Sequence, residues 1–414
     1  MSQAKSARRV VITGMGVVTP IGIGVPDFWA SIKEGRCGVS RVENFPLEDL
    51  YIHIAAEVKN FDPRARLSFL QRDKVGANAD RYSWFALAAA QEAMTQSGLA
   101  LPVENPYRVA SVIGSGAGGL VTFEKGYRDL FILKKKATHP LTLLRIIGSS
   151  ASAHVGIEFG IRGPTFATCS ACSTATHAIG LVYQFIKQNM IDVGIAGASE
   201  AVLTYGTMRS WQAMRVLSNE GCFPFAKKRN GTVLGEGAGL LVLEEYEHAK
   251  ARGANILAEL KGFAMTSDAK DMVNPDIEGP KEAMRLALED AELAPSDIDY
   301  LNAHGTATAI NDVNETRAIK AVFGSHAGKM AVSSTKSMHG HPLGAGGGIE
   351  AVASIQAIRE QILPPTIGLD EADPECDLDY VPNVARKAKI TYAMSNSFAF
   401  GGLNAVLVLG PPPA

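Results

Sequence analysis

One cysteine in this chain lies where a thiol can act as a nucleophile. Cys172 follows a short β-rich stretch that begins at Gly163 and precedes a helical pattern from Thr176 to about Lys187. At a strand-to-helix junction, the N–H groups and the dipole of the helix favour the thiolate, which is the reactive form of cysteine. The neighbouring side chains are small and leave room for a substrate carbonyl. The sequence therefore makes Cys172 a candidate nucleophile.

The same stretch allows other interpretations. Cys169 and Cys172 form a C-x-x-C pair, which is typical of redox dithiols and of one half of a zinc site. A zinc ribbon needs a second such pair, and the sequence has none. A redox pair usually lies near the start of a small domain. A third alternative is an inert cysteine in the core.

Two histidines in glycine-rich runs far along the chain are candidate partners of the thiol. His304 follows a predicted strand and precedes two hydroxyl residues, Thr306 and Thr308. His341 ends a run that also contains Lys336 and a His-x-His pair. A core histidine bonded to backbone is the alternative for His304. A Cys-His-His metal site is the alternative for the cysteine and both histidines together.

Two further glycine runs follow predicted strands and suggest a nucleotide site at first sight. They are Gly14-Met15-Gly16 and the run from Gly114 to Gly119. A dinucleotide fingerprint needs G-x-G-x-x-G at a helix start and an acidic residue ~20 positions later at a strand end. Neither run meets both conditions, so the sequence does not favour a bound nucleotide.

The last motif is a pair of phenylalanines beside two glycines. Phe398 and Phe400 precede Gly401-Gly402 in the run from Ser395 to Asn404. This pattern is typical of a loop that moves or approaches a ligand closely. The alternative is a tight turn with packed aromatic side chains.

Composition narrows the class of protein. The 414 residues are 46% hydrophobic and 20% charged, with a net charge of −2, so we expect an ordinary folded core and neither nucleic acid nor an anionic membrane as partner. Five cysteines, an odd and sparse set, argue for a reducing compartment. No apolar run suits a signal peptide or approaches the ~18 residues of a membrane span. We therefore expect a soluble cytoplasmic protein.

Strand-like runs alternate with longer helical patterns, which predicts α/β layers. The predicted strands cover residues 9–13, 109–113, 165–171, 192–196, 240–244, 256–263, 298–302, 330–334, 390–394 and 405–410. The predicted helices cover residues 27–33, 81–96, 176–187, 280–291 and 346–361.

The pattern of strands and helices repeats within the chain. The strand-and-helix unit at 165–187 is similar to the unit at 330–361, and the strand at 192–198 is similar to the one at 390–395. The sequence therefore predicts two related halves. Residues 1–255 contain the cysteine and residues 256–414 contain both histidines.

Together these motifs resemble the β-ketoacyl-acyl-carrier-protein synthases, condensing enzymes of the thiolase fold, and synthase II most closely. The segments around Cys172, His304 and His341 occur in the order and spacing of that family, and the likeness covers nearly the whole chain. Residues 205–211 and 230–237 also resemble nodulation protein E, a specialised relative that serves unusual acyl chains.

The resemblance implies an α/β fold of five layers, α-β-α-β-α, from two duplicated halves. It implies acyl carrier protein as partner, and a homodimer or a pair with a chain-length-factor-like subunit that lacks the cysteine. It implies no metal and no other cofactor, because the phosphopantetheine arm arrives on the carrier protein. A non-catalytic Cys/His metal or redox protein is the alternative from another class.

The resemblance also implies a reaction. Cys172 takes an acyl chain as a thioester, and malonyl carrier protein loses carbon dioxide and attacks it, giving a β-ketoacyl chain two carbons longer. His304 and His341 stabilise the enolate, and the backbone N–H groups of Cys172 and Phe400 form an oxyanion hole. Lys336 supports His304; an ion pair with Glu350 is its alternative function. The pathway is fatty acid elongation or, alternatively, a specialised polyketide, polyene or nodulation-factor pathway.

Other residues are expected at the substrate. Thr306 and Thr308 are expected to bind the phosphopantetheine arm, and Phe400, beside Phe398, to act as a gate. Ala117 and Thr142 stand where the family often has bulkier side chains along the acyl tunnel, which predicts a deeper acyl pocket.

The chain departs from the family at the gate and in a second mobile loop. The departures are Ala399, Leu403, Asp271 and Val273. Because carrier proteins are acidic, we also expect a basic rim at the tunnel mouth. The candidates for this rim are Lys134, Lys135, Lys136, Lys125, Arg128, Arg64, Arg66 and Arg72.

Overall fold

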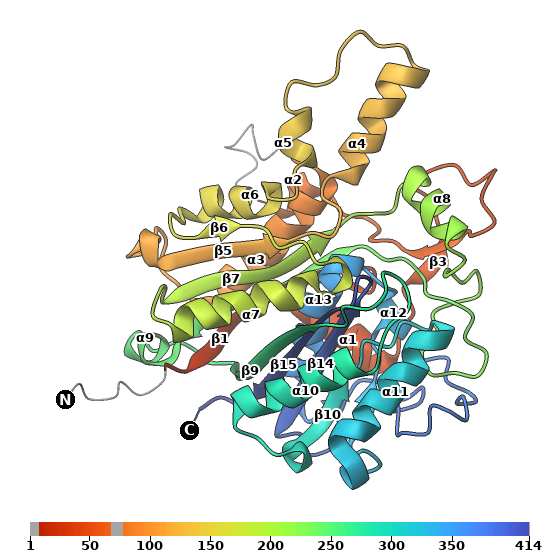
Figure 1. Ribbon diagram of the computed structural model, residues 1–414. Helices are drawn as coiled ribbons and strands as arrows, with labels where there is room; N and C mark the ends of the chain where they lie inside the picture. The colour runs from red at the N-terminus through yellow and green to blue at the C-terminus, as the bar shows by residue number, and fades with distance from the viewer. Residues whose placement is uncertain (1–7, 68–77, 414) are drawn as a thin grey trace.

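The main sheet consists of two groups of strands that repeat one topology. The computed structural model describes residues 8–67 and 78–413 (Figure 1). The first group contains β1 (Val10–Thr19), β5 (Val109–Gly114), β6 (Thr165–Phe166), β7 (Val193–Glu200) and β8 (Gly237–Glu245). The second group contains β9 (Ala258–Ser267), β10 (Ile298–Asn302), β11 (Ala331–Ser333), β14 (Tyr392–Ala399) and β15 (Leu403–Gly410).

Both groups have the same strand order and the same directions. The first runs β1-β8-β7-β5-β6 and the second β9-β15-β14-β10-β11. In each group the first two pairings are antiparallel and the last two are parallel. The groups join where Val10–Ile12 pairs antiparallel with Ala258–Leu260. This repeated topology confirms the predicted duplication.

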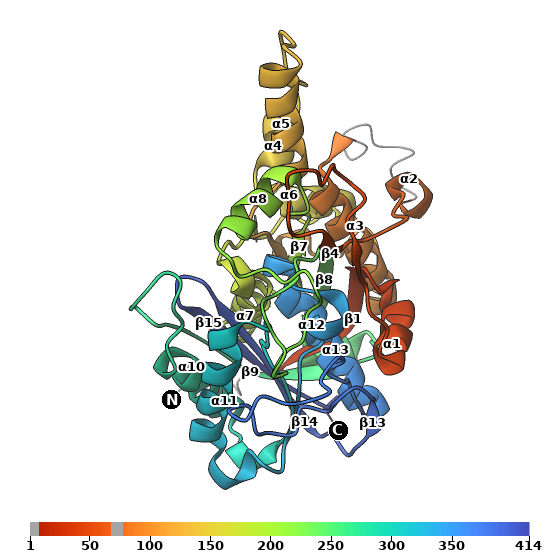
Figure 2. The same ribbon diagram turned by 90° about the vertical axis from the view of Figure 1, so that its right-hand side faces the viewer.

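Helices cover the two groups of strands on both sides and fill the space between them. The outer helices are α3 (Arg81–Ser97) and α6 (Ser150–Phe159) on the first group and α10 (Glu278–Ala291) and α11 (Ala309–Phe323) on the second. The central helices are α7 (Thr174–Lys187) and α13 (Gly346–Glu360), which contact each other and strands of both groups. Within the described residues the layers are therefore α-β-α-β-α, as predicted (Figures 1 and 2).

The central helices owe their place to small and apolar side chains. Every residue of α13 from Gly346 to Ile358 is buried, which is the pattern of a helix enclosed on all sides. At Gly348 and Gly239 the backbones of α13 and β8 approach so closely that a Cβ on either glycine would lie 2.2 Å from the other segment. Glycine is therefore required where the central layer meets the sheet.

A helical arm leaves the body of the molecule between β5 and β6. It contains α4 (Leu120–Tyr127), a π-helical turn (Arg128–Ile132) and α5 (Thr142–Ile146). Figures 1 and 2 show it as a narrow protrusion beyond the rest of the chain. We call this segment, residues 120–147, the arm.

Shorter elements complete the chain. They are β2 (Gly22–Ile23), α1 (Val25–Glu34), β3 (Val39–Arg41), β4 (Ile54–Ala56), α2 (Pro63–Arg66), α8 (Tyr205–Ala213), α9 (Tyr246–Ala251), α12 (Lys336–His339), β12 (Ile362–Leu363) and β13 (Arg386–Lys387), with 3-10 turns at Pro106–Arg108, Ala171–Ser173, Pro295–Asp297, Gly324–His326 and Leu343–Ala345. In the part of the chain that is described, no helix has the length and apolar character needed to cross a membrane.

The predicted strand at 165–171 is wrong beyond its second residue. β6 ends at Phe166, and hydrogen bonds with Thr174 hold the loop that follows. Thr168 Oγ1 donates to the carbonyl of Thr174 (3.0 Å), and Ser170 N–H donates to Thr174 Oγ1 (2.9 Å). Cys169 was expected to be a strand residue and instead lies exposed in this loop.

Gly180 provides a test of the packing between the two halves. It lies on α7, and a Cβ there would lie 2.2–2.4 Å from the ring of Phe263 on β9. We expect Gly180→Ala to lower the free energy of unfolding by roughly 1–3 kcal/mol despite the better helix propensity of alanine. Urea titration measures this change. Gly328→Ala is the control because no atom lies within 4 Å of its Cβ position; equal stability of the two variants would contradict the packing argument.

Candidate active site

A strained turn presents Cys172 at the start of the central helix α7. Ala171 has φ of 46°, a left-handed conformation that is uncommon for residues other than glycine. Thr174 holds this turn, because its hydroxyl donates to the carbonyl of Ala171 at 2.7 Å. Ser173 Oγ bonds the carbonyls of Ser397 (2.9 Å) and Leu403 (2.7 Å) in the other half of the chain. The turn is therefore anchored to both halves.

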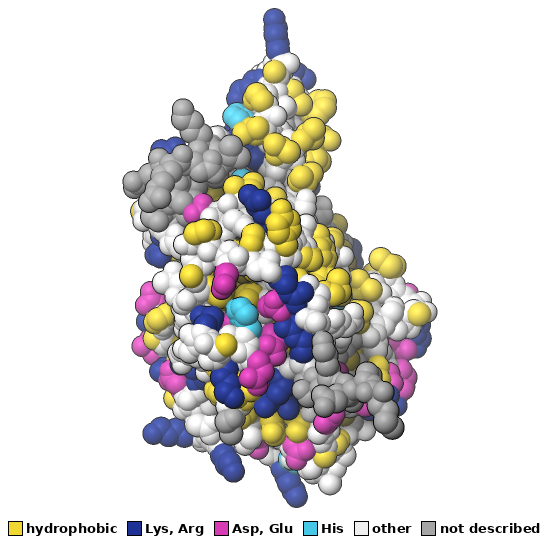
Figure 3. Space-filling model, turned by 90° about the vertical axis from the view of Figure 1, so that its left-hand side faces the viewer, with side chains coloured by type: hydrophobic (Ala, Val, Ile, Leu, Met, Phe, Trp, Pro, Cys, Tyr) yellow, Lys and Arg dark blue, Asp and Glu magenta, His cyan; other side chains and the backbone are white. Residues whose placement is uncertain are grey.

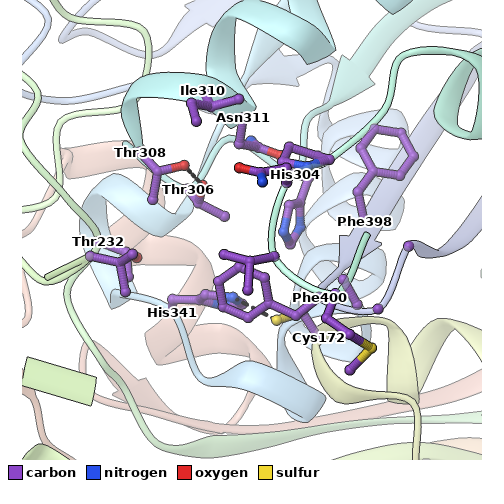
Figure 4. Close-up of a pocket in the computed structure, with 18 of the residues that line it drawn as sticks. Cys172, Thr232, His304, Thr306, Thr308, Ile310, Asn311, His341, Phe398 and Phe400 are labelled. Carbon is purple, nitrogen blue, oxygen red and sulfur yellow. Dashed lines mark hydrogen bonds between the residues drawn. The ribbon is translucent and has the colours of Figure 1, made fainter. Parts of the chain in front are cut away.

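The two histidines come from the ends of strands in the second half. His304 follows β10, and His341 follows β11 and α12 and precedes α13. His341 thus occupies the place in its half that Cys172 occupies in the first. His341 Nε2 lies 3.1 Å from Cys172 Sγ, and the rings of His304 and His341 are 5.5 Å apart at 83°. One nitrogen of each histidine and the sulfur all lie within 4.8 Å of one another (Figure 4).

Lys336 lies behind the histidines and is almost completely buried. Its Nζ donates to the carbonyl of His304 at 2.7 Å and lies 3.4 Å from His304 Nδ1. It also forms an ion pair with Glu350, and both side chains are 1% exposed. The two functions considered for Lys336 from the sequence, support of His304 and an ion pair with Glu350, therefore occur together.

Burial and the charge of Lys336 decide the protonation of the site. Burial raises the pKa of the Cys172 thiol to about 12, although Lys336 acts in the opposite direction. Burial and Lys336 both hold the pKa values of His304 and His341 well below 6.5. The thiol and both rings are therefore neutral at rest. The N–H groups at the helix start favour the thiolate, as expected, but burial has the larger effect and leaves the thiol protonated.

Two backbone N–H groups point at the sulfur. The N–H groups of Phe400 and of Cys172 itself lower the pKa of the thiol, against the larger effect of burial. Phe400 lies in the tight turn between β14 and β15, where Gly401 and Gly402 have φ of 82° and 68°. Gly401 N–H donates to the carbonyl of Met272 at 2.9 Å, so this turn and the loop at 268–276 are joined.

A cavity of about 270 Å³ leads from the surface to these groups. Cys172, His304 and His341 line its inner end, and Thr306 and Thr308 line its wall with their hydroxyls 2.9 Å apart (Figure 4). Further wall residues are Thr232, Asn230, Asn311 and Phe398, and the exposed apolar side chains of Met272, Val273 and Ile310 form the mouth. Asp271 caps its own loop by accepting from Val273 and Asn274.

The structure does not bring every predicted residue to this cavity. Ala117 is exposed in the turn after β5, and Thr142 starts α5 on the arm; neither lines the cavity. Of the basic candidates, Lys134–Lys136 lie between the two helical segments of the arm, and Lys125 and Arg128 lie on it. Arg64 and Arg66 lie on α2. None of these lines the cavity, and Arg72 lies outside the described residues.

Three functional candidates were missed from the sequence. Arg215 lines the cavity mouth and is exposed, but nothing in its sequence context distinguishes it from a surface arginine. Glu200 and Glu315 are fully buried beside the site, and burial raises the pKa of each to about 7. An acidic residue that ends an apolar strand, as Glu200 ends β7, is a signal that sequence analysis can use.

Glu315 fixes the segment that carries His304. Its carboxylate accepts from the backbone N–H groups of His304 and Gly305, both at 2.8 Å, and from Asn396 Nδ2 at 3.2 Å. The side chain therefore holds the strand end of one histidine against β14.

The cysteine and histidines are also a set that can hold a metal ion. Their ligand atoms are close enough for a shared ion, and sulfur and imidazole nitrogen suit zinc. The same arrangement of thiol and imidazoles suits nucleophilic acyl transfer with N–H donors for an oxyanion. Geometry alone is compatible with both chemistries.

The comparisons with known proteins decide the class. Residues 7–249 match the β-ketoacyl synthase N-terminal domain, and residues 257–370 match the β-ketoacyl synthase C-terminal domain. Nodulation protein E of Rhizobium leguminosarum bv. trifolii is 46% identical over 97% of this chain and 98% of its own length. The 3-oxoacyl-[acyl-carrier-protein] synthase 2 of Staphylococcus aureus (strain COL) is 42% identical over 99% of both chains. The chain therefore belongs to the β-ketoacyl synthase family.

Solved structures agree with this assignment. The ishigamide ketosynthase/chain length factor superposes with a TM-score of 0.93 at 32% identity, covering 99% of this chain and 100% of the other. A type II polyketide ketosynthase in complex with its acyl carrier protein superposes with a TM-score of 0.88 at 34% identity, covering 98% of this chain and 100% of the other. The protein is thus a thiolase-like condensing enzyme of the acyltransferase class, and the predictions of family, fold and enzyme class are confirmed.

The buried carboxyl of Glu315 predicts a pH dependence of stability. Its pKa is about 7 in the folded protein, whereas the ordinary pKa of a glutamate side chain is 4.5. A raised pKa means that the folded state binds the proton more tightly, so this contribution is complete below pH 4.5 and is lost as the pH rises through 7. We expect the free energy of unfolding to fall by about 3 kcal/mol from this group over that range.

Glu315→Gln removes the titrating group and tests this directly. We expect a variant that is less stable at pH 5, because an amide cannot accept both backbone N–H groups, but whose stability changes less between pH 5 and 8. Urea unfolding at several pH values measures this slope. Glu375→Gln, at an exposed carboxyl, is the control. An unchanged slope in Glu315→Gln would show that Glu315 does not titrate as described.

Proposed function

We propose that this enzyme lengthens an acyl chain on an acyl carrier protein by two carbons, through decarboxylative condensation with malonyl carrier protein. The observation that carries the proposal is the convergence of Cys172 Sγ with nitrogens of His304 and His341 within 4.8 Å at the inner end of the cavity. The 42% identity to a 3-oxoacyl-[acyl-carrier-protein] synthase 2 supports this substrate class.

The first half-reaction transfers the acyl group to Cys172. A new bond forms between Sγ and the acyl carbon, and the bond from that carbon to the carrier's arm sulfur breaks. Because the resting thiol is neutral, its proton has to leave, and the departing arm thiolate takes it up; His341 Nε2, 3.1 Å from the sulfur, donates to the sulfur as its negative charge develops. The N–H groups of Cys172 and Phe400 stabilise the tetrahedral oxyanion.

The second half-reaction makes the carbon–carbon bond. The malonyl group loses carbon dioxide, and the electrons of the broken bond form an enolate whose oxygen accepts from His304 and His341. The enolate carbon then attacks the acyl carbon on Cys172, and the released thiolate takes a proton from water. Burial and the charge of Lys336 keep both rings neutral, and the same charge favours this step because it stabilises nearby negative charge.

We propose that no metal and no redox cofactor takes part. No step changes an oxidation state, and each developing negative charge meets N–H donors of this chain. The phosphopantetheine arm of the carrier protein is a substrate. Thr306 and Thr308 on the cavity wall would bind it, and Arg215 at the mouth offers a positive charge to an acidic carrier protein.

Phe400 is proposed as the gate between the two half-reactions. Its ring lies 5.9 Å from that of Trp211 on α8 and its turn is joined to the loop at 268–276. Phe398 lies beside it on β14, 6.1 Å from the ring of His304. Movement of the turn would therefore change the space beside the nucleophile and the mouth of the cavity together.

We propose that a second chain covers the arm, either another copy or a chain-length-factor-like subunit. One side of the arm is apolar and exposed (Figure 3). Its exposed apolar residues are Phe123, Tyr127, Phe131, Ile132, Leu133, Leu143, Leu144 and Ile147. Such a patch on a protein surface marks an interface, and one structural relative is described as a ketosynthase/chain length factor.

The same second chain would complete the acyl pocket. Ala117 and Thr142 line no part of the cavity in the single chain. Ala117 lies just before the arm, and Thr142 lies on it at the start of α5. Their small side chains then leave room for a long acyl group. Together with the 46% identity to a nodulation protein E, this supports a second candidate function, the synthesis of a specialised acyl chain.

Modification of Cys172 tests the reaction. Cerulenin, an acyl mimic that reacts with catalytic cysteines, should add to Cys172, and Cys172→Ala should lose both the adduct and condensation activity. Cys169→Ala is the matched control and should retain both. Mass spectrometry of peptides and a carrier-protein elongation assay make the measurements. An adduct on Cys169, or one bound zinc per chain, would instead favour the metal or redox protein.

Chain length tests the acyl pocket. Ala117→Ile adds bulk where we propose that the acyl chain lies, so elongation of long acyl carrier substrates should fall about tenfold or more while short ones react almost as before. A panel of acyl carrier proteins measures this preference. As a control, the variant should have the same state of assembly in solution as the wild type, judged by its molecular mass. An unchanged preference for chain length would refute the position given to Ala117.

A further inference from the structure

A buried carboxylate joins the two sides of the nucleophile and has no part in the reaction described above. Glu200 is the last residue of β7 and is completely buried. Its Oε1 accepts from Ser115 Oγ at 2.8 Å, and its Oε2 accepts from the backbone N–H groups of Gly116 (2.7 Å) and Gly344 (3.1 Å). The first two donors follow β5 in the first half, and the third follows His341 in the second half.

The contact with Ser115 extends to the segment that contains Ala117. Ser115 Oγ donates to Glu200 and accepts from the backbone N–H groups of Gly118 (2.8 Å) and Ala117 (3.3 Å). The serine hydroxyl therefore transmits the position of the carboxylate to the turn at 115–118. Loss of the carboxylate would leave this turn without its fixed acceptor.

The packing around the carboxylate leaves no room for other side chains. A Cβ at Gly116 would lie 2.9 Å from Glu200 Oε2, and a Cβ at Gly344 would lie 2.7 Å from the same atom. The position for the Gly344 Cβ is also 3.2 Å from Thr174, which holds the strained turn before Cys172. Glu200 thus lies where three backbone segments around the nucleophile touch.

His341 itself is held by other contacts. Its backbone N–H donates to the carbonyl of Val233 at 2.7 Å, and its carbonyl accepts from Gly235 at 2.9 Å. The bond from Gly344 to Glu200 is therefore not what fixes the histidine. The part of the site that depends on Glu200 is the turn at 115–118.

We propose that Glu200 is a positioning residue for acyl loading: it fixes the turn at 115–118 as the wall beside Cys172 against which the acyl chain lies. The inference rests on the proposed function, because it assigns the acyl side of the same site. The proposal predicts different effects on the two half-reactions. Malonyl decarboxylation depends on His304 and His341, and other groups hold these histidines: Glu315, Lys336 and the backbone of Val233.

The charge of Glu200 gives a second, independent readout. The charged groups that act on the Cys172 thiol are the cation of Lys336 and the carboxylate of Glu200; the neighbouring rings of His304 and His341 are neutral. Glu200 raises the pKa of the thiol while Lys336 lowers it. Removal of the carboxylate charge therefore makes the thiolate easier to form.

The experiment compares Glu200→Gln with Ser115→Ala in the full-length protein. Three rates are measured: acylation of Cys172 from acyl carrier protein by mass spectrometry, release of carbon dioxide from malonyl carrier protein, and alkylation of Cys172 by iodoacetamide as a function of pH. We expect acylation to fall roughly tenfold or more in both variants, with carbon dioxide release within about twofold of the wild type. The alkylation profile should move to lower pH in Glu200→Gln only, because Ser115→Ala keeps the charge.

Two outcomes overturn the proposal. One is an equal loss of acylation and decarboxylation, and the other is no loss of acylation in either variant. If Glu200→Gln does not fold, Ser115→Ala alone decides, because it removes the hydroxyl that holds Ala117 and Gly118 and leaves the carboxylate bonded to Gly116 and Gly344. If the wild type neither acylates Cys172 nor releases carbon dioxide, the proposed function fails; the alkylation profile then still reports whether Glu200 acts on the thiol.

Discussion

The buried charge of Lys336 is the interaction on which the site depends. A cation that is 1% exposed needs a partner, and Glu350 supplies it. With that balance in place, Lys336 lowers the pKa values of Cys172 and of both histidines. The histidines remain neutral donors, and the charge of Lys336 partly offsets the rise that burial causes in the pKa of the thiol. Lys336 also fixes the position of His304 through its carbonyl. One buried ion pair thus acts, together with burial, on the protonation of the site and also on its geometry.

Duplication explains why these groups meet. Each half places a reactive side chain before its central helix, Cys172 before α7 and His341 before α13. Because the two central helices pack against each other between the layers of strands, their starts lie together. Neither half contains a complete site. The glycines and small residues of α7 and α13 are therefore a functional requirement, since larger side chains would move the two halves apart.

The two sides of the nucleophile are built differently. On the histidine side, Glu315, Lys336 and the backbone near Val233 hold every group within the single chain. On the acyl side, Ala117 is exposed and the arm presents uncovered apolar residues. The buried carboxylate of Glu200 connects these sides, because it accepts from Ser115 on the acyl side and from Gly344 on the histidine side. The groups of the proposed reaction thus all come from one chain, whereas the proposed acyl pocket lies beside the exposed arm.

From the sequence we could predict the family and the duplicated α/β layers, which are confirmed, and could name Cys172, His304 and His341 as catalytic candidates. Each of these depends on local patterns: small residues before a helix, strand ends followed by glycine, and alternating strands and helices. The sequence did not determine the state of Cys172. A helix start favours a thiolate, but burial, which is set by packing from both halves, raises the pKa of the thiol. It also could not place Ala117, Thr142 or the basic residues of the arm, nor identify Arg215 and Glu315. Their positions relative to the sulfur arise from contacts between segments far apart in the chain, so the folded structure is needed to place them.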